Sequence, residues 1–184
     1  MQMTPQALLP RYPTPALNVP LVSGGRFVLG AQPGERFDLI TFYRGLHCPI
    51  CAKYLIELER LSSEFAAHGV SLIAISSDNE ERARGMVEKV KSSGVRLGYG
   101  LSLRSARQWG LYISTSRGKT STGIDEPPLF SEPGVFLVRR DGTLYYGAVQ
   151  TMPFARPPFQ DLLGAIEFAI AKDYPARGEF TGEV

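Results

Sequence analysis

Hydrophobic residues recur along this sequence with two different periods. Runs of β-forming residues at 37–43 and 70–76 have the length and composition of buried strands. Between them, apolar residues recur every three or four positions from residue 51 to residue 65, which predicts an amphipathic helix that ends at Gly69. A similar spacing at Ala83, Met86, Val87 and Val90, after an N-cap at Ser77-Asp78-Asn79, predicts another helix after the second run. This strand-helix-strand-helix order implies right-handed βαβ units and therefore an α/β fold.

Shorter elements are expected in the rest of the chain. Glycine-containing turns separate some of the apolar runs, as in antiparallel hairpins. The expected elements are a hairpin over residues 16–29 that turns at Ser23-Gly24-Gly25, a short strand at 96–100, a short helix at 102–109, a strand at 136–138, a return strand at 143–149 after a turn at Asp141-Gly142, and a closing helix at 158–172.

The chain is expected to form one domain over residues 16–175, with an arm at residues 1–15 and a tail at residues 176–184. Four prolines argue against regular structure in the arm, which we expect to lie along the surface, to reach a second subunit or to be free. Residues 112–130 are rich in Ser, Thr, Gly and Pro, which predicts a long irregular loop. Such a loop is either a functional lid or simply mobile, and the sequence leaves both open.

Composition narrows the class of protein. The 184 residues are 43% hydrophobic, and a net charge of +2 with interspersed acids and bases gives no basic stripe for nucleic acid. The most apolar late run, residues 162–171, contains Glu167 and is far shorter than the roughly 20 residues that span a bilayer. The N-terminal residues lack the pattern of a secretory signal, so we expect a cytoplasmic protein without membrane contact.

The two cysteines of the chain, Cys48 and Cys51, both lie where the first strand gives way to the first helix. Pro49 suits the first helical position because its fixed φ matches the helix and its missing N–H costs nothing there. The free N–H groups and the helix dipole favour an anion, so Cys48 is predicted to be the more acidic thiol and the exposed attacking group. Cys51 is then the buried partner that closes on a mixed disulfide. In a reducing compartment, a catalytic or sensing dithiol is a better use of such a pair than a structural disulfide.

Two other interpretations of the cysteine pair remain. A zinc site needs two more ligands, and the two histidines of the chain, His47 and His68, are poorly placed for a tetrahedral site because one adjoins Cys48 and the other lies at the far end of the helix. Two unreactive core thiols are the second interpretation, which suits Cys51 better than the pair. We therefore expect no metal and no organic cofactor.

The string FYRGLHCPIC at residues 42–51 resembles the thioredoxin superfamily, in which a CxxC motif opens the first long helix after a central strand. Its Cys-Pro-x-Cys order is similar to glutaredoxins. The wider string resembles the peroxiredoxin-like branch of the alkyl hydroperoxide reductase and thiol-specific antioxidant (AhpC/TSA) family. This resemblance implies a thioredoxin-like three-layer sandwich, with a central mixed sheet and an N-terminal β-hairpin extension.

Peroxiredoxins carry Pro, then Thr or Ser, then the peroxidatic Cys at three spaced positions of this motif. In this chain the three positions are Arg44, Cys48 and Cys51. The peroxide-binding Arg of that family corresponds to Pro133. Because the activating groups are replaced, the resemblance argues against efficient peroxide reduction. Arg44 is interpreted either as a displaced cation near the thiolates or as an exposed turn residue.

The string EPGVFLVRRDG at residues 132–142 carries the rest of the resemblance. Pro133 resembles the cis-proline that faces the CxxC motif and lines the substrate groove in the superfamily. Glu132 would then lie beside the nucleophile and accept its proton or raise its pKa, unless it is a solvated loop carboxylate. His47 is expected either to stabilise the Cys48 thiolate when it is protonated or to shape access at the rim of the pocket.

The sequence therefore predicts a peroxiredoxin-like thiol-disulfide oxidoreductase and antioxidant in which Cys48 attacks and Cys51 resolves. Expected partners are an oxidised protein, a small-molecule disulfide or a hydroperoxide, together with a reducing dithiol such as thioredoxin or glutathione; a homodimer is left open. One alternative is a thiol peroxidase in which Cys51 is peroxidatic and Cys48 resolving. Another is a non-catalytic redox sensor or adaptor on a thioredoxin scaffold. Residues 150–158 are interpreted as part of a substrate or dimer surface, or as a loop that covers the sheet edge.

Overall fold

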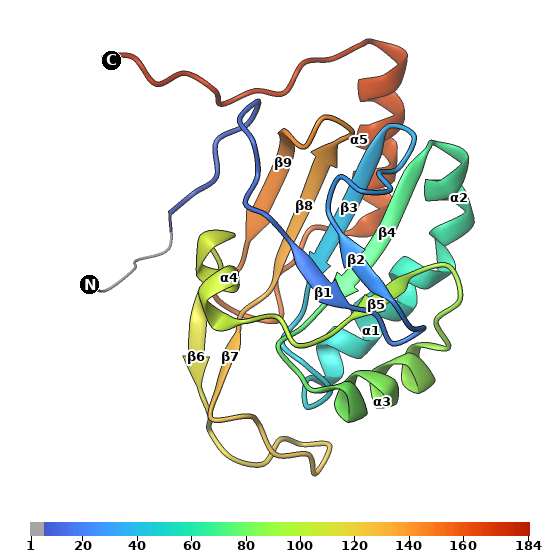
Figure 1. The fold of residues 1–184 in the computed structure, drawn as a ribbon, viewed down its shortest axis with the longest axis vertical. Coiled ribbons are helices and arrows are strands. Elements are labelled where there is room, and N and C mark those ends of the chain that lie inside the picture. The colour runs from blue at the N-terminus through green and yellow to red at the C-terminus, as the bar shows by residue number, and fades with distance from the viewer. Residues whose placement is uncertain (1–5) are drawn as a thin grey trace.

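A computed structural model describes residues 6–184, and its centre is a five-stranded sheet (Figure 1). The strand order is β5 (Arg96–Gly98), β4 (Val70–Ile75), β3 (Phe37–Phe42), β8 (Gly134–Arg139) and β9 (Leu144–Val149). Strands β3, β4 and β5 run parallel to one another, whereas β8 is antiparallel to both β3 and β9. The predicted central mixed sheet of an α/β fold is confirmed.

Two layers cover the two faces of this sheet. Helices α1 (Pro49–Arg60), α2 (Ser62–Ala67), α3 (Glu80–Val90) and α5 (Phe159–Ala171) share one hydrophobic core with one face. Hairpin β1–β2 (Asn18–Pro20 and Arg26–Val28) and helix α4 (Leu103–Gln108) share a second core with the opposite face. The three-layer sandwich with an N-terminal hairpin extension is therefore confirmed.

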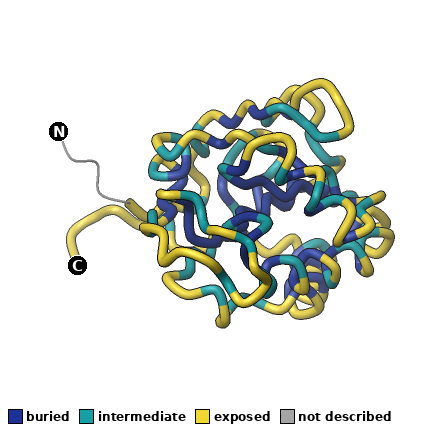
Figure 2. Tube along the Cα trace, turned by 90° about the horizontal axis from the view of Figure 1, so that it is seen from below, coloured by how far each residue is buried: buried dark blue, intermediate teal, exposed yellow. Residues whose placement is uncertain are grey.

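Alternation along the central strands explains why both faces are apolar. Leu39 of β3 and Leu72 of β4 belong to the core under the helices, whereas their neighbours Ile40 and Ile73 belong to the core under the hairpin. Successive side chains of a strand point to opposite faces, so a continuous apolar run supplies both cores. In Figure 2 the central strands are dark blue and the connecting loops around them are mostly exposed.

The first helix differs from its prediction. The periodic segment over residues 51–65 is interrupted at Leu61, so that it forms two helices, α1 and α2. The Leu61 N–H is shared between the carbonyls of Glu57 and Leu58, each at 3.2 Å, which tightens the chain there. Leu61 and Phe65 are both fully buried, and the change of direction keeps both in the same core. Gly69, with φ 72°, ends the second helix as predicted.

The segment predicted to be one irregular loop at residues 112–130 is partly regular. Its ends form an antiparallel pair of strands, β6 (Ile113–Thr115) and β7 (Leu129–Ser131). Residues 116–128 between them, which we call the hairpin loop, carry further backbone contacts, including an isolated bridge between Lys119 and Asp125. Cross-strand hydrogen bonds overrode the low strand propensity of this composition.

The N-terminal arm lies against the domain where the structure describes it. The backbone N–H groups of Arg11 and Thr14 donate to the carbonyls of Leu144 and Gly142, at 2.8 and 3.0 Å. Arg11 also donates to the carbonyl of Ala176 at 2.9 Å, which ties the arm to the start of the tail. Residues 1–5 of the predicted arm lie outside the described residues. The division at residues 15 and 175 stays a prediction.

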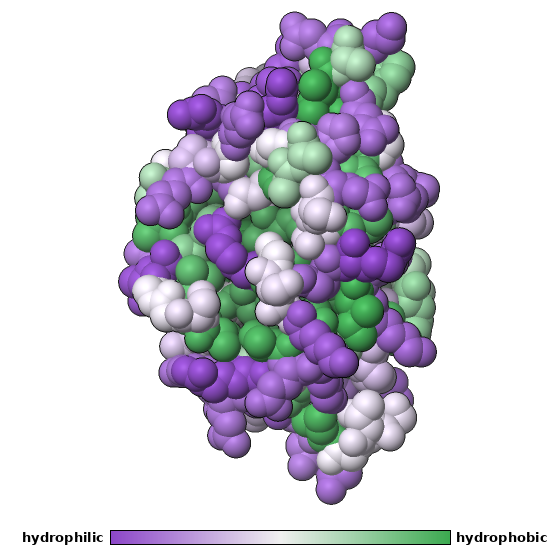
Figure 3. Space-filling view, turned by 90° about the vertical axis from the view of Figure 1, so that its right-hand side faces the viewer, coloured by the Kyte–Doolittle hydropathy of each residue, from purple (hydrophilic) through white to green (hydrophobic). Residues whose placement is uncertain are grey.

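Among residues 6–184, none of the helices combines the length and the apolar character needed to cross a bilayer. The face seen in Figure 3 carries hydrophobic side chains between hydrophilic ones. An apolar groove of about 330 Å³ lies between β9 and α5, lined among others by Tyr146, Leu162 and Phe168.

Candidate active site

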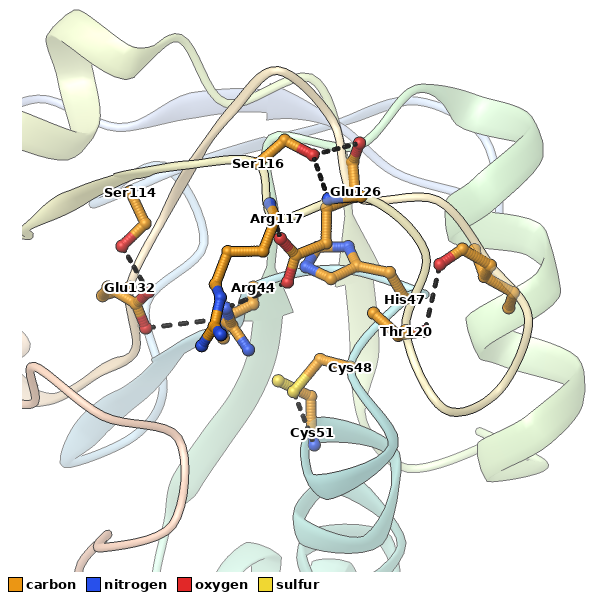
Figure 4. A network of polar contacts seen from close by, with 12 residues as sticks. Arg44, His47, Cys48, Cys51, Ser114, Ser116, Arg117, Thr120, Glu126 and Glu132 are labelled. Atoms are coloured by element: carbon orange, nitrogen blue, oxygen red, sulfur yellow. Dashed lines mark hydrogen bonds and ion pairs between the residues drawn. The ribbon is translucent and has the colours of Figure 1, made fainter.

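The cysteine pair lies at the N-terminus of α1, directly after strand β3. Cys48 is the N-cap residue and Pro49 occupies the first turn, as the sequence predicts. The Cys48 Sγ accepts a hydrogen bond from the backbone N–H of Cys51 at 3.2 Å (Figure 4). Gly45 makes this strand-to-helix turn possible, because its φ is 141° and a Cβ there would lie 2.7 Å from the Asp78 carboxylate. The same carboxylate accepts from the Leu46 N–H at 2.7 Å and so fixes the turn.

The two thiols have opposite pKa shifts. A hydrogen bond from the Cys51 thiol is the largest cause that lowers the pKa of Cys48 to about 6, and the Cys51 N–H, Arg156 and Arg44 lower it further against the effect of burial. Burial is the largest cause that raises the pKa of Cys51 well above its ordinary value. At neutral pH, Cys48 therefore carries the thiolate and Cys51 carries the proton.

Arg156 contacts both sulfurs from the segment between β9 and α5. Its Nη2 lies 3.1 Å from the Cys51 Sγ and 3.9 Å from the Cys48 Sγ. Its Nε donates to the carbonyl of Pro153 at 2.9 Å, and its guanidinium lies 5.0 Å from the centre of the Tyr54 ring. This side chain is held in place on several sides, so that a positive charge lies beside the dithiol.

Cys48 is buried, not exposed as the sequence suggested: its exposed fraction is 2%, and that of Cys51 is 0%. The reason is that two segments distant in sequence cover the helix N-terminus. Cys48 nevertheless lines an open cavity of about 400 Å³. The other lining residues are Arg44, His47, Pro49, Ile50, residues 117–121, Glu126, Pro153 and Phe154. This cavity is therefore a route by which a substrate can reach Cys48.

Arg44 lies between two carboxylates at the edge of the site (Figure 4). Its Nη2 is 3.3 Å from Glu126 Oε1, and its Nε is 3.4 Å from Glu132 Oε2. Its guanidinium also lies 4.7 Å from the centre of the Phe130 ring. Glu126 accepts in addition from the backbone N–H of Arg117 at 2.7 Å. Arg44 is thus a mostly buried cation that joins the β3–α1 turn to the hairpin loop, and the alternative of an exposed turn residue was wrong.

His47 is not a cation that could stabilise the Cys48 thiolate. Burial, followed by the positive charges of Arg44 and Arg82, lowers the pKa of His47 to about 4, so the ring is neutral at pH 7. Its Nδ1 lies 3.2 Å from Arg82 Nη2, and its ring lies 4.8 Å from that of Phe130. His47 lines the cavity, which fits the alternative in which it shapes access.

The expected cis-proline is absent, because every peptide bond of residues 6–184 is trans. Glu132 and Pro133 link β7 to β8 through trans peptide bonds. Pro133 also does not line the Cys48 cavity. Glu132 is buried, not a solvated loop carboxylate, and it accepts from Ser114 Oγ at 2.6 Å and pairs with Arg44. Its described contacts include none with Cys48, so an influence on the thiol would pass through Arg44.

Two parts of the site were missed by sequence reasoning: Arg156 as a neighbour of the sulfurs, and Glu126. The hairpin loop lies within residues 112–130, for which a functional lid was one of the two interpretations, and part of it lines the Cys48 cavity. Arg156 was noted only as part of a surface segment, and its place 108 positions after Cys48 gave no local signal. Among residues 6–184, no three His, Cys, Asp or Glu side chains are grouped so that they could hold a metal ion.

An acidic thiol and a protonated partner thiol at the helix that follows the central strand of a thioredoxin-like sheet define a thiol oxidoreductase. A family model described as Redoxin matches residues 13–163, most of the chain. The chain belongs to this redoxin family and is a peroxiredoxin-like protein of the thioredoxin superfamily. No curated protein sequence matches it significantly.

Solved peroxiredoxin structures share its fold. Peroxidoxin BcpB from Mycobacterium tuberculosis superposes with a TM-score of 0.68 at 18% identity, over 88% of this chain and 97% of that one. AhpC from Mycobacterium tuberculosis gives 0.72 at 12% identity, over 92% and 96% of the two chains. A mutant of peroxiredoxin 6 from Arenicola marina gives 0.71 at 18% identity, over 91% and 76%. These superpositions show that the fold is that of a peroxiredoxin. The arrangement of Cys48 and Cys51 is read from the sequence of this chain itself.

Proposed function

We propose that this chain is a peroxiredoxin-like thiol-disulfide oxidoreductase in which Cys48 attacks and Cys51 resolves. The observation that supports this most is the contrast between the two sulfurs. Cys48 has a pKa lowered to about 6 by the Cys51 thiol and lines the cavity, whereas Cys51 is fully buried and its pKa is raised. At pH 7 the thiolate of Cys48 outnumbers its thiol by about ten to one.

In the first step, the Cys48 thiolate attacks one sulfur of a substrate disulfide. A bond forms between Cys48 Sγ and that sulfur, the substrate S–S bond breaks, and the leaving thiolate takes a proton from solvent. Cys51 then loses its proton and attacks Cys48 Sγ, which releases the second substrate thiol and leaves a Cys48–Cys51 disulfide. The substrate gains two electrons from the protein and two protons, of which Cys51 releases one and solvent supplies the other.

Arg156 has a defined part in this sequence. Because its Nη2 lies 3.1 Å from Cys51 Sγ, it favours the thiolate that Cys51 must become in the second step. It lies 3.9 Å from Cys48 Sγ and stabilises that thiolate more weakly. A reducing dithiol such as thioredoxin, or glutathione, would restore the pair in a reducing compartment, which we propose is the cytoplasm.

A second candidate function is thiol peroxidase, and the position of Arg156 favours it, because this cation lies closer to Cys51 than to Cys48. In that reaction the Cys51 thiolate attacks a hydroperoxide, the O–O bond breaks, and an alcohol or water leaves. The resulting sulfenic acid then condenses with Cys48, loses water and forms the same disulfide.

Two single variants, Cys48→Ser and Cys51→Ser, separate these functions and serve as each other's matched control. Reduced protein is mixed with a model disulfide and, separately, with hydrogen peroxide. The disulfide reaction predicts that Cys48→Ser loses the first step by at least about a hundredfold, whereas Cys51→Ser traps a mixed disulfide on Cys48 that mass spectrometry detects.

Peroxide consumption by Cys48→Ser, with a sulfenic acid on Cys51 that dimedone labels, would instead establish the peroxidase. Wild-type protein that is oxidised reversibly but turns over neither substrate would contradict both enzymatic functions. The non-catalytic redox sensor or adaptor would then be the interpretation that remains.

A further inference from the structure

We propose that the cavity beside Cys48 is specific for a small disulfide or thiol that carries carboxylate groups, and that Arg117 and Lys119 of the hairpin loop recognise its negative charge. This inference rests on the proposed function, because it takes Cys48 as the attacking thiol. It adds the substrate class and two specificity-determining residues outside the dithiol.

The size of the cavity favours a small molecule. Its volume of about 400 Å³ falls within the roughly 300–1,000 Å³ that is typical of small-molecule sites. Residues 117–121 on one segment and Pro153 and Phe154 on another line it together with Cys48, whose exposed fraction is only 2%. The disulfide of a folded protein is itself held in a rigid surface and would have to displace these segments to reach the sulfur.

The charges of the lining favour an anion. Three cations, Arg44, Arg117 and Lys119, face one carboxylate, Glu126. That carboxylate is already engaged, by Arg44 at 3.3 Å and by the backbone N–H of Arg117 at 2.7 Å. Within residues 6–184, the side chains of Arg117 and Lys119 form no ion pair. Two positive charges are therefore left without a partner at the cavity.

The position of these cations fits recognition of a substrate during the reaction. Arg117 and Lys119 lie on the exposed hairpin loop, and the side chain of Arg117 reaches from this loop toward Arg44 (Figure 4). Both residues line the same cavity as Cys48, so a carboxylate held there would lie close to the reacting sulfur. Cations at the opening also attract an anionic substrate toward a negatively charged thiolate, which would otherwise repel it.

The apolar part of the lining fits the remainder of such a molecule. Ile50, Pro153 and Phe154 contribute to the cavity, and Phe154 is 76% exposed. A large exposed aromatic residue beside a reactive group commonly marks a contact surface. The occupant therefore has an aliphatic body that contacts these side chains and carboxylates that reach the hairpin loop. Glutathione disulfide has this chemistry, and simpler disulfides reproduce it.

The test compares three aliphatic disulfides of similar size and different charge: dithiodipropionic acid (anionic), hydroxyethyl disulfide (neutral) and cystamine (cationic). The rate at which each oxidises the reduced protein is measured at neutral pH and divided by the rate of the same disulfide with dithiothreitol, which corrects for intrinsic reactivity. The expected order is anionic, then neutral, then cationic.

The double variant Arg117→Gln and Lys119→Gln should lower the corrected rate of the anionic disulfide by about three- to tenfold and leave the neutral one unchanged, as expected for two exposed ion pairs. The preference should also weaken as salt is added. The matched control, Arg140→Gln with Lys172→Gln, removes the same charge from exposed positions that do not line the cavity and should change neither rate.

The outcomes separate this inference from the proposed function. Reduction of the neutral disulfide through Cys48, with no preference for the anionic one or with an equal effect of the control variant, would overturn the inference alone. Failure of the wild-type protein to react with all three disulfides would overturn the proposed function. Faster reduction of insulin than of dithiodipropionic acid would overturn the assignment of a small substrate.

Discussion

Helix α1 and the two segments that cover its N-terminus are held in place by different forces. The helix buries Cys51, Tyr54, Leu55 and Leu58 in the core beneath the sheet. Arginines supply several of the contacts that attach the covering segments, residues 116–128 and 150–157, and the Tyr54 hydroxyl also donates to the carbonyl of Pro157. Arg44 pairs with Glu126, Arg82 donates to the carbonyl of Asp125 at 3.2 Å, and Arg156 contacts the two sulfurs.

This difference indicates a division of roles. The helix fixes the two sulfurs relative to each other, and apolar burial makes that arrangement rigid. The covering segments decide which molecules reach Cys48 and which charges surround it. Changes in the helix should therefore lower stability, whereas changes in the covering segments should alter reactivity or access at little cost in stability.

The largest expected effect is on stability, from Leu58→Ala in α1. Leu58 is fully buried, so the truncation should lower the free energy of unfolding by about 2–5 kcal/mol, measured by denaturant titration. Phe154→Ala removes a larger side chain from a covering segment, but because that side chain is mostly exposed the loss should stay within about 0.5 kcal/mol.

Ile56→Ala is the control within the same helix, since its side chain is 46% exposed. A loss for Ile56→Ala or Phe154→Ala that equals the loss for Leu58→Ala would contradict the comparison.

The second effect is a loss of stability in acid that depends on His47. Its pKa is lowered from 6.5 to about 4 in the folded protein, mainly by burial, so the unfolded chain binds a proton that the folded chain does not. Stability is therefore lost as pH falls from about 6.5 through 4, by roughly 3 kcal/mol at pH 4 relative to pH 7.

Unfolding free energies of wild type and His47→Gln across this range measure the contribution of His47, since the variant should lose that part of the pH dependence. The same slope in wild type and His47→Gln would show that the ring is not held neutral by its surroundings.

The smallest effect concerns reactivity alone. Arg156→Gln removes a positive charge beside both sulfurs, so the pKa of Cys48 should rise above about 6, by up to about one unit. The pH dependence of alkylation by iodoacetamide measures it. Arg156→Lys retains the charge and should shift the pKa less, while Arg140→Gln, at an exposed position that does not line the cavity, should not shift it. A thiol pKa that is the same in wild type and Arg156→Gln would show that Arg156 does not stabilise the Cys48 thiolate.

Local sequence pattern was enough to predict much of this protein. The period of the apolar residues predicted the strands β3 and β4 and a helical segment between them, although not its division into α1 and α2, and Cys48 and Pro49 identified the start of α1. The turn at Asp141-Gly142 was also predicted, and Gly142 has the positive φ, 82°, that such a turn needs. In these cases the determining interactions lie within a few residues of one another, so the sequence alone determined them.

Only the tertiary structure decided what surrounds the two sulfurs. Arg156 reaches Cys48 across 108 positions, and Glu126 reaches Arg44 across 82. The burial of Cys48 and the neutral state of His47 likewise depend on segments brought together by the sheet. No local period encodes such contacts, because their partners are fixed by the packing of the whole domain. The sequence thus determined where the dithiol lies, and the fold determined which charges surround it and which cavity leads to it.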